Sequence, residues 1–254
     1  MSEFTEGANR LVLIGGMATT GKSASLKPVS NPEGVMYLNA EGKSLPFRSK
    51  FQEHKIVDPL QIYEAFTYAT STETGKNIHT IVLDSFTFLM DMYEQKYVVD
   101  NPPLTKQGGK DSLAGWGNYA MFGRRLFLEY MAKCPKNKIV LGHTKEVYND
   151  KEMVREVKID VKGSLNGKGI EAFFSTVINA KRVDLETLKD FENKYLAITE
   201  EDEYNGYKYV FQTRLTKETS GERIRSPMGM WDRSETYIDN NVQHVIDRLD
   251  EYYN

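Results

Sequence analysis

The stretch Leu11-Val-Leu-Ile-Gly-Gly-Met-Ala-Thr-Thr-Gly-Lys-Ser23 joins an apolar run to a glycine-bearing turn that ends in Gly-Lys-Ser. From Gly16 onward it follows the pattern G-x-x-x-x-G-K-[ST], in which backbone N–H groups surround phosphate oxygens. The run from Leu11 to Ile14 has the character of a buried strand, which is the context that this pattern requires. The alternative interpretation, a turn with a surface lysine, does not explain that context. We therefore predict a phosphate-binding loop.

The residues of this loop have different predicted roles. Lys22 is expected to contact the β and γ phosphates, and the Ser23 hydroxyl to take one position on Mg²⁺. Gly16 and Gly21 let the backbone bend, and the N-terminus of a short following helix, ended by Pro28, adds partial positive charge. The predicted nucleotide contacts are Gly16, Met17, Ala18, Thr19, Thr20, Gly21, Lys22, Ser23 and Ala24.

Size and composition limit the alternatives. The chain has 254 residues, enough for one α/β domain with a full core, and a net charge of -3, so a nucleic-acid contact requires a local basic patch. The single cysteine, Cys134, cannot form an internal disulfide and suits a reducing compartment. Residues 1–10 are polar, and no apolar run approaches about eighteen residues. We expect a cytoplasmic protein with no membrane partner.

Polar residues end three further apolar runs, which are Val35–Glu41, Ile78–Ser85 and Lys138–Thr144. The carboxyl ends of parallel strands form the edge of a sheet where ligands bind, so Glu41, Asp84 and His143 are expected beside the phosphate loop. An acid such as Asp84 is what a nucleotide hydrolase uses for Mg²⁺. His143 is a candidate sensor of the γ-phosphate; the alternative is an ordinary hydrogen-bonded histidine.

The remaining pattern predicts an α/β fold with a mostly parallel central sheet flanked by helices and extended by antiparallel strands toward the C-terminus. Predicted helices cover 59–70, 86–99, 118–133 and 240–253, and further strands cover 55–58, 174–183 and 207–214, with a hairpin turn at Asn149-Asp150. We interpret 1–254 as a single domain, with a core of about 9–183 and C-terminal strands and a helix over about 184–254.

Three polar segments are candidate contact loops. Residues 101–117 are rich in proline and glycine, and 162–169 are flexible and positively charged, which suits a phosphate backbone. Trp116 or Tyr148 could stack on bases. The segment 216–225 carries cations that could reach a neighbouring subunit's nucleotide, namely Lys217, Arg223 and Arg225. Plain surface loops with solvated charges are the alternative for all three.

Two nucleotide-binding classes do not fit. A guanine-specific domain needs an Asn-Lys-x-Asp tetrapeptide after the strand near 141, where this chain has His143-Thr-Lys-Glu146. Small-molecule kinases usually carry an arginine-rich lid between late helices, whereas the late part of this chain is rich in strands. ATP and Mg²⁺ are therefore the expected cofactors.

Four motifs together carry a resemblance: Gly21-Lys-Ser, Leu38-Asn-Ala-Glu-Gly42, Ile81-Val-Leu-Asp-Ser85 and Val140-Leu-Gly-His-Thr-Lys145. Over about 9–183 the chain resembles the RecA-type ATPase core and, more narrowly, the phage nucleotide-binding proteins of the RecA-like single-strand annealing group, the Sak-four type. The resemblance implies a RecA-like P-loop ATPase in which Glu41 polarises the attacking water, Asp84 and Ser23 serve Mg²⁺, and Lys22 and His143 contact the γ-phosphate.

The same resemblance implies partners. The loops 101–117 and 145–169 would face single-stranded DNA in a homo-oligomeric ring or filament. The activity would be a Mg²⁺-dependent ATPase of phage DNA recombination, annealing, repair or replication, in the host cytoplasm with phage or host replication or recombination proteins. Two alternatives stay open: a hexameric helicase-like or DNA-packaging motor, and a nucleotide-switched binding module that does not hydrolyse ATP.

Overall fold

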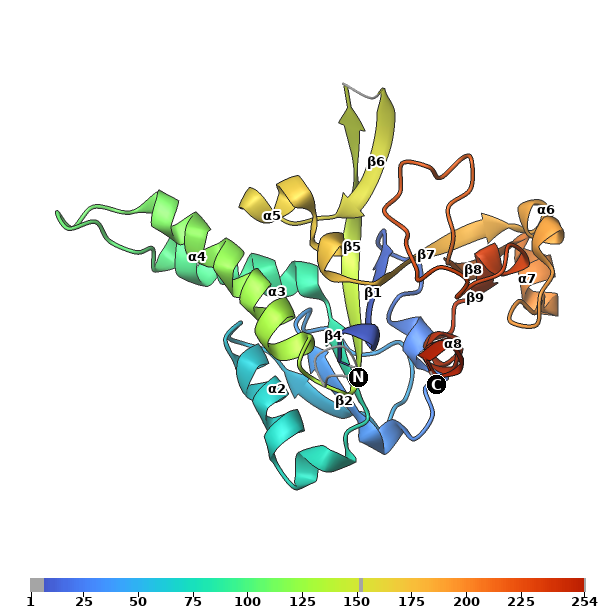
Figure 1. Ribbon diagram of the computed structural model, residues 1–254, viewed down its shortest axis with the longest axis horizontal. Helices are drawn as coiled ribbons and strands as arrows, with labels where there is room; N and C mark the ends of the chain where they lie inside the picture. Colours follow the sequence, from blue (N-terminus) through green and yellow to red (C-terminus); the bar gives the residue numbers. More distant parts are fainter. Residues whose placement is uncertain (1–6, 151–152, 254) are drawn as a thin grey trace.

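The computed structural model describes residues 7–150 and 153–253. A central sheet runs through them in the order β3-β2-β4-β5-β1-β7-β8-β9, with β6 paired to β5 (Figure 1). The strands from β3 to β7 in this order are parallel, and β6, β8 and β9 are antiparallel to their neighbours. The bounds are β1 Leu11–Gly16, β2 Val35–Asn39, β3 Gln52–Lys55, β4 Thr80–Asp84, β5 Asn137–Asn149, β6 Val154–Ile159, β7 Thr176–Asp184, β8 Tyr207–Gln212 and β9 Tyr237–Asp239.

Helices cover both faces of the sheet, because the parallel strands are apolar on both sides. Along β1, Leu11 and Leu13 belong to the core that packs against α2, α3 and α4, whereas Val12 and Ile14 belong to the core under α8. The helices are α2 Gln61–Ser71, α3 Phe86–Tyr93, α4 Ser112–Arg125, α5 Gly163–Lys168, α6 Leu185–Leu188, α7 Glu200–Asn205 and α8 Val242–Tyr253.

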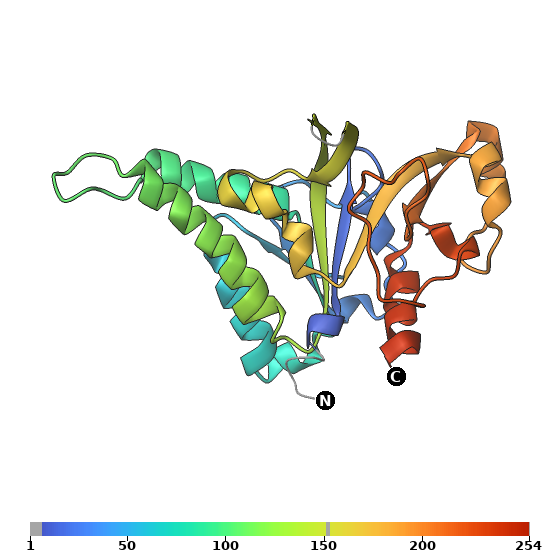
Figure 2. The ribbon, with the colours of Figure 1, turned by 45° about the horizontal axis from the view of Figure 1, so that its top comes forward.

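Two arms extend from this body. The helical arm consists of α3 with its π-helical continuation Glu94–Asp100, the loop 101–111, and α4 with its continuation Leu126–Met131. It lies at one end of the molecule, and α6 and α7 lie at the opposite end in both views (Figures 1 and 2). The hairpin arm is formed by residues 144–149 of β5 and by β6, and it extends beyond the rest of the sheet.

The predicted α/β fold, with a mostly parallel central sheet flanked by helices and antiparallel strands toward the C-terminus, is confirmed. The prediction of a helix after the phosphate loop is wrong: Ser23 is followed by the 3₁₀ turn Ala24–Leu26. Pro28 lacks an N–H donor, so it cannot extend the hydrogen-bonded pattern and the turn does not grow. The strand predicted at 55–58 is also misplaced, because β3 is Gln52–Lys55. This edge strand is mostly exposed and polar and carries no apolar signal.

Parts of the predicted loops are helical. Helix α4 begins at Ser112, inside 101–117, and the Asp111 side chain caps it by accepting from the N–H of Ala114 at 2.9 Å. The segment 162–169 contains α5, which is anchored by the buried Leu165. The hairpin predicted at Asn149-Asp150 is confirmed by the pairing of β5 with β6, and residues 151 and 152 at its tip lie outside the described residues, as do residues 1–6.

Candidate nucleotide-binding site

The phosphate loop follows β1 directly and curls around one lysine. The Lys22 ammonium donates to the carbonyl oxygens of Gly16 and Met17, at 2.8 Å each. Thr19 and Gly21 adopt positive φ values of 65° and 83°, which turn the chain back on itself. Gly16 has no room for a side chain, since a Cβ there would lie 2.8 Å from the carbonyl oxygen of Ala180 on β7. The loop is therefore locked against the sheet.

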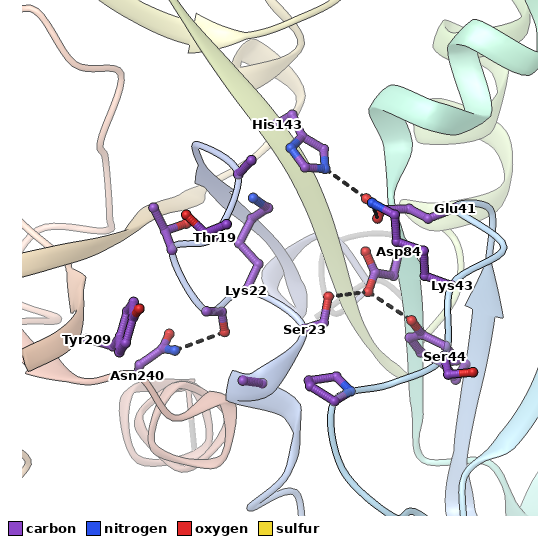
Figure 3. A pocket seen from close by; sticks show the side chains of 16 residues that line it. Thr19, Lys22, Ser23, Glu41, Lys43, Ser44, Asp84, His143, Tyr209 and Asn240 are labelled. Atoms are coloured by element: carbon purple, nitrogen blue, oxygen red, sulfur yellow. Dashed lines mark hydrogen bonds and ion pairs between the residues drawn. The ribbon is translucent and has the colours of Figure 1, made fainter. Parts of the chain in front are cut away.

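A pocket of about 490 Å³ opens above this loop (Figure 3). Four residues predicted from separate strand ends or from the loop, Lys22, Glu41, Asp84 and His143, line it together. Of the predicted nucleotide contacts, residues 18–24 line the pocket, and Gly16 and Met17 hold Lys22 through their carbonyls. The other lining residues are Tyr37, Lys43, Ser44, Pro46, Tyr209 and Asn240.

Oxygen ligands gather at the end of β4. The Ser23 hydroxyl donates to Asp84 Oδ2 at 2.7 Å, and the Tyr37 hydroxyl donates to the same oxygen at 2.8 Å. Asp84 is almost fully buried, and this burial raises the pKa of its carboxyl group. Hard oxygen ligands of this kind are those that Mg²⁺ prefers. Ser23 and Asp84 therefore fit the predicted magnesium site, and the structure adds Tyr37, which the sequence showed only as part of a buried strand.

The Glu41 carboxylate is held from two strands. Its Oε1 accepts from the Ser85 hydroxyl at 3.0 Å and lies 2.7 Å from His143 Nε2. His143 reaches this position because it pairs in register with Gly16 across β1 and β5. The hydrogen bond with His143 is the main cause that lowers the pKa of Glu41 to about 2, against the opposing effect of burial. Glu41 is therefore a fixed, charged acceptor facing the pocket.

Burial also changes Lys22. It lowers the pKa of the ammonium group from 10.5 to about 8, although the carboxylates of Asp84 and Glu41 favour the charged form. A triphosphate in the pocket would add negative charge beside this group and would restore its usual basicity. A bound triphosphate would thus stabilise the charged form of Lys22, which in turn attracts the phosphates.

Asn240 and Tyr209 are site residues that the sequence did not predict. The Asn240 side chain donates to the carbonyl oxygen of Gly21 at 2.9 Å, and the Tyr209 ring lies beside the same glycine. They approach the loop from the start of α8 and from β8, on the side opposite Glu41 (Figure 3). Their separation from Gly21 along the chain, 219 residues for Asn240, leaves no local signal that could have revealed them.

The three cations proposed to act on a neighbouring subunit differ in whether they form ion pairs within their own subunit. Arg223 pairs with Glu156 at 3.1 Å and with Glu171 at 3.6 Å, so within its own subunit it braces the hairpin arm. Lys217 and Arg225 are exposed and form no ion pair within the described parts of the chain. Neither lines the pocket of its own subunit.

A family model described as an AAA domain matches residues 8–219 of this sequence. The chain belongs to this family of P-loop ATPases. No curated protein matches this sequence significantly. Among solved structures it is similar to the flagellar accessory protein FlaH from Methanocaldococcus jannaschii, with 12% identity, 81% of this chain and 77% of that chain covered, and a TM-score of 0.39. This likeness is too slight to bear on function.

Within residues 7–150 and 153–253, no helix has the length and apolarity needed to cross a lipid bilayer.

Proposed function

We propose that this AAA-domain protein is a Mg²⁺-dependent ATP hydrolase that binds single-stranded DNA and supports phage DNA recombination, annealing, repair or replication. One observation carries the hydrolase part: the Glu41 carboxylate, 2.7 Å from His143 and 3.0 Å from Ser85, faces the pocket that also holds Lys22 and Asp84. A base, a phosphate-binding cation and a magnesium site in one cavity are the parts that ATP hydrolysis requires.

Each of these residues has a task in the proposed reaction. Glu41, kept charged by a pKa of about 2, orients the attacking water and polarises it toward the γ-phosphate. Lys22 neutralises the charge that develops on the phosphate oxygens. Ser23 and Asp84 would hold Mg²⁺, which when bound supplies further positive charge to the phosphates. His143 fixes the orientation of Glu41 and lies where a γ-phosphate would be sensed.

The DNA part of the proposal is supported by the continuity of β5. His143 contacts Glu41 in the pocket, and from Thr144 onward the same strand forms the hairpin arm. Tyr148 on that arm is 55% exposed and offers a ring for base stacking. A strand that touches both the catalytic acid and the DNA contact would couple hydrolysis to DNA binding.

Several exposed lysines in the loops 101–117 and 145–169 form no ion pair within the described residues and are available to phosphates, namely Lys106, Lys110 and Lys168. Lys162 is not available, because it pairs with Glu94 at 2.5 Å. Trp116 is partly buried, with its ring 5.3 Å from that of Tyr119, which leaves Tyr148 as the better stacking residue. We further propose a homo-oligomeric ring or filament in which Lys217 or Arg225 reaches the neighbour's nucleotide.

The decisive experiment measures ATP turnover with and without a single-stranded oligonucleotide. We expect turnover in the wild type, stimulation by the oligonucleotide, loss of turnover with retained ATP binding in Glu41→Gln, and strongly weakened ATP binding in Lys22→Ala. Glu64→Gln, an exposed carboxylate on α2 outside the pocket, is the matched control. Undiminished turnover in Glu41→Gln would exclude the proposed mechanism.

The DNA and motor hypotheses separate in the same experiment. Unstimulated turnover in the wild type, with no retention of the labelled oligonucleotide, would exclude the DNA function and leave the ATPase. Directional displacement of a paired strand would instead favour a helicase-like or packaging motor over an annealing protein.

A further inference from the structure

An apolar groove lies between the start of α2 and the helical arm, and it shares no lining residue with the nucleotide pocket. It has a volume of about 380 Å³ and an aromatic floor of Tyr63, Tyr93 and Phe122. Two exposed apolar side chains of the α4 segment, Met121 and Leu128, line its walls, and Met121 is 65% exposed. Exposed methionine and leucine beside buried aromatic rings are typical of a surface that another protein covers. We call this surface the arm groove.

The arm groove is also positively charged. Arg125 lies over the Tyr63 ring at 5.3 Å and pairs with Glu129 at 2.9 Å, which neutralises it. Arg124, one residue earlier, is exposed and forms no ion pair within the described parts of the chain. An occupant of this groove should therefore present both an apolar or aromatic side chain and negative charge.

Such a surface exists at the opposite end of the same molecule. Helix α7 places exposed carboxylates around an exposed aromatic ring: Glu200, Glu201 and Glu203 surround the turn that carries Tyr204, which is 88% exposed. The helix is held rigidly, because Thr199 and Asp202 form a capping box and Lys208 pairs with Asp202 at 2.8 Å. A rigid segment loses little conformational entropy when it binds.

We propose that α7 of one copy docks into the arm groove of the next copy, with Tyr204 in the groove and Arg124 facing the carboxylates of α7. This inference rests on the proposed oligomer and names the two surfaces that build it. The helical arm and α7 lie at opposite ends of the sheet (Figures 1 and 2), so the contact is head to tail and each added copy presents a free groove and a free α7. Such a contact forms a ring if the rotation closes and a filament if it does not.

Two variants, each measured alone and then mixed, test this arrangement. Met121→Glu places a charge in the groove and Tyr204→Glu removes the ring from α7, and because both side chains are exposed, neither change should disturb folding. In sedimentation velocity with Mg²⁺ and ATP, each variant alone should be monomeric, with assembly weakened by at least about thirtyfold. An equimolar mixture should form dimers and nothing larger, since one intact groove meets one intact α7 and both outer ends are blocked.

The outcomes separate the inference from the proposed function. Met228→Glu changes a residue that is 92% exposed and lies on neither surface, and it should assemble like the wild type. Wild-type assembly in Met121→Glu or Tyr204→Glu, or a mixture that stays monomeric, overturns the docking and leaves the oligomer. A monomeric wild type overturns both. Binding of a fluorescent ATP analogue should be the same in all these variants, because none of these residues lines the nucleotide pocket.

Discussion

His143 Nε2 lies 2.7 Å from Glu41 Oε1, although the two residues are 102 positions apart in the sequence. The contact joins the end of β2 to the middle of β5 across the mouth of the pocket. It fixes both the direction and the charge of the carboxylate, because a hydrogen bond to the charged form of an acid favours that form. The histidine thereby controls the acid that the proposed reaction uses.

Removal of His143 should move the acid limb of the pH profile. The hydrogen bond from His143 is the largest of the interactions that lower the pKa of Glu41 from 4.5 to about 2, so the wild-type carboxylate stays charged as the pH falls to about 3. In His143→Ala the pKa of Glu41 should rise, and turnover should therefore fall at a pH at least about one unit higher than in the wild type. ATP turnover measured from pH 3.5 to 8 checks this, with His54→Ala, an exposed histidine on β3, as the control. Identical acid limbs in His143→Ala and wild type would contradict the proposed role.

ATP affinity should decrease above pH 8. Burial lowers the pKa of Lys22 to about 8 in the free protein, and bound phosphates require the charged ammonium. Affinity should therefore be about tenfold weaker at pH 9 than at pH 7, with proton uptake on binding at the higher pH. Calorimetry in two buffers of different ionisation enthalpy measures both quantities. Lys22→Ala should bind weakly and show no such dependence; a wild-type affinity that is constant up to pH 9.5 would contradict the lowered pKa.

Loss of the Asn240 side chain should weaken nucleotide binding more than it weakens the fold. Asn240→Ala removes the hydrogen bond to the carbonyl of Gly21, which is worth about 1 kcal/mol, or about a fivefold change in Kd. The thermal midpoint should change little, since the side chain is only partly buried. Titration with a fluorescent ATP analogue and a melting curve test the two parts. Asn101→Ala, which removes an exposed hydrogen bond to Lys96 in the helical arm, should leave Kd unchanged.

Two glycine-to-alanine changes should shift the free energy of unfolding in opposite directions. In Gly16→Ala the new Cβ would lie 2.8 Å from the Ala180 carbonyl oxygen, so the unfolding free energy should fall by about 1–3 kcal/mol and nucleotide binding should be lost. In Gly117→Ala the Cβ meets nothing within 4 Å inside α4, and stability should rise by about 0.5–1 kcal/mol. Urea denaturation of both variants measures the difference. A neutral Gly16→Ala would show that the loop does not pack tightly against β7.

The convergence of Lys22, Glu41, Asp84 and His143 could be predicted because each residue ends an apolar run or closes a local motif. Parallel strands bring such ends to one edge of a sheet whatever the chain does between them. Asn240 and Tyr209 could not be predicted, because their positions depend on how the antiparallel strands return α8 to the phosphate loop. The site role of Tyr37 could not be predicted for another reason: its ring belongs to the core, and only its hydroxyl reaches Asp84.

Local composition also led to wrong predictions of secondary structure, where tertiary packing outweighs the local preference. Gly115 and Gly117 suggested a loop, yet both lie in α4. At Gly115 the small residue lets two neighbours approach, since a Cβ at this position would lie 3.4 Å from the Val98 side chain and 3.6 Å from that of Pro103. The strand β3 is polar because it closes the sheet and faces solvent, so no alternation of apolar residues marks its bounds.

The 3₁₀ turn Ala24–Leu26 gives the phosphate loop a different electrostatic character from one that opens a long helix. A full helix end contributes about half a positive charge through aligned peptide dipoles. Here the attraction comes from whole charges instead, Lys22 within the loop and the exposed Lys43 at the rim. Mobile ions screen an exposed charge such as Lys43 within about 8–10 Å at physiological ionic strength, whereas the buried Lys22 is screened much less, so added salt should weaken only the part of the attraction that Lys43 supplies.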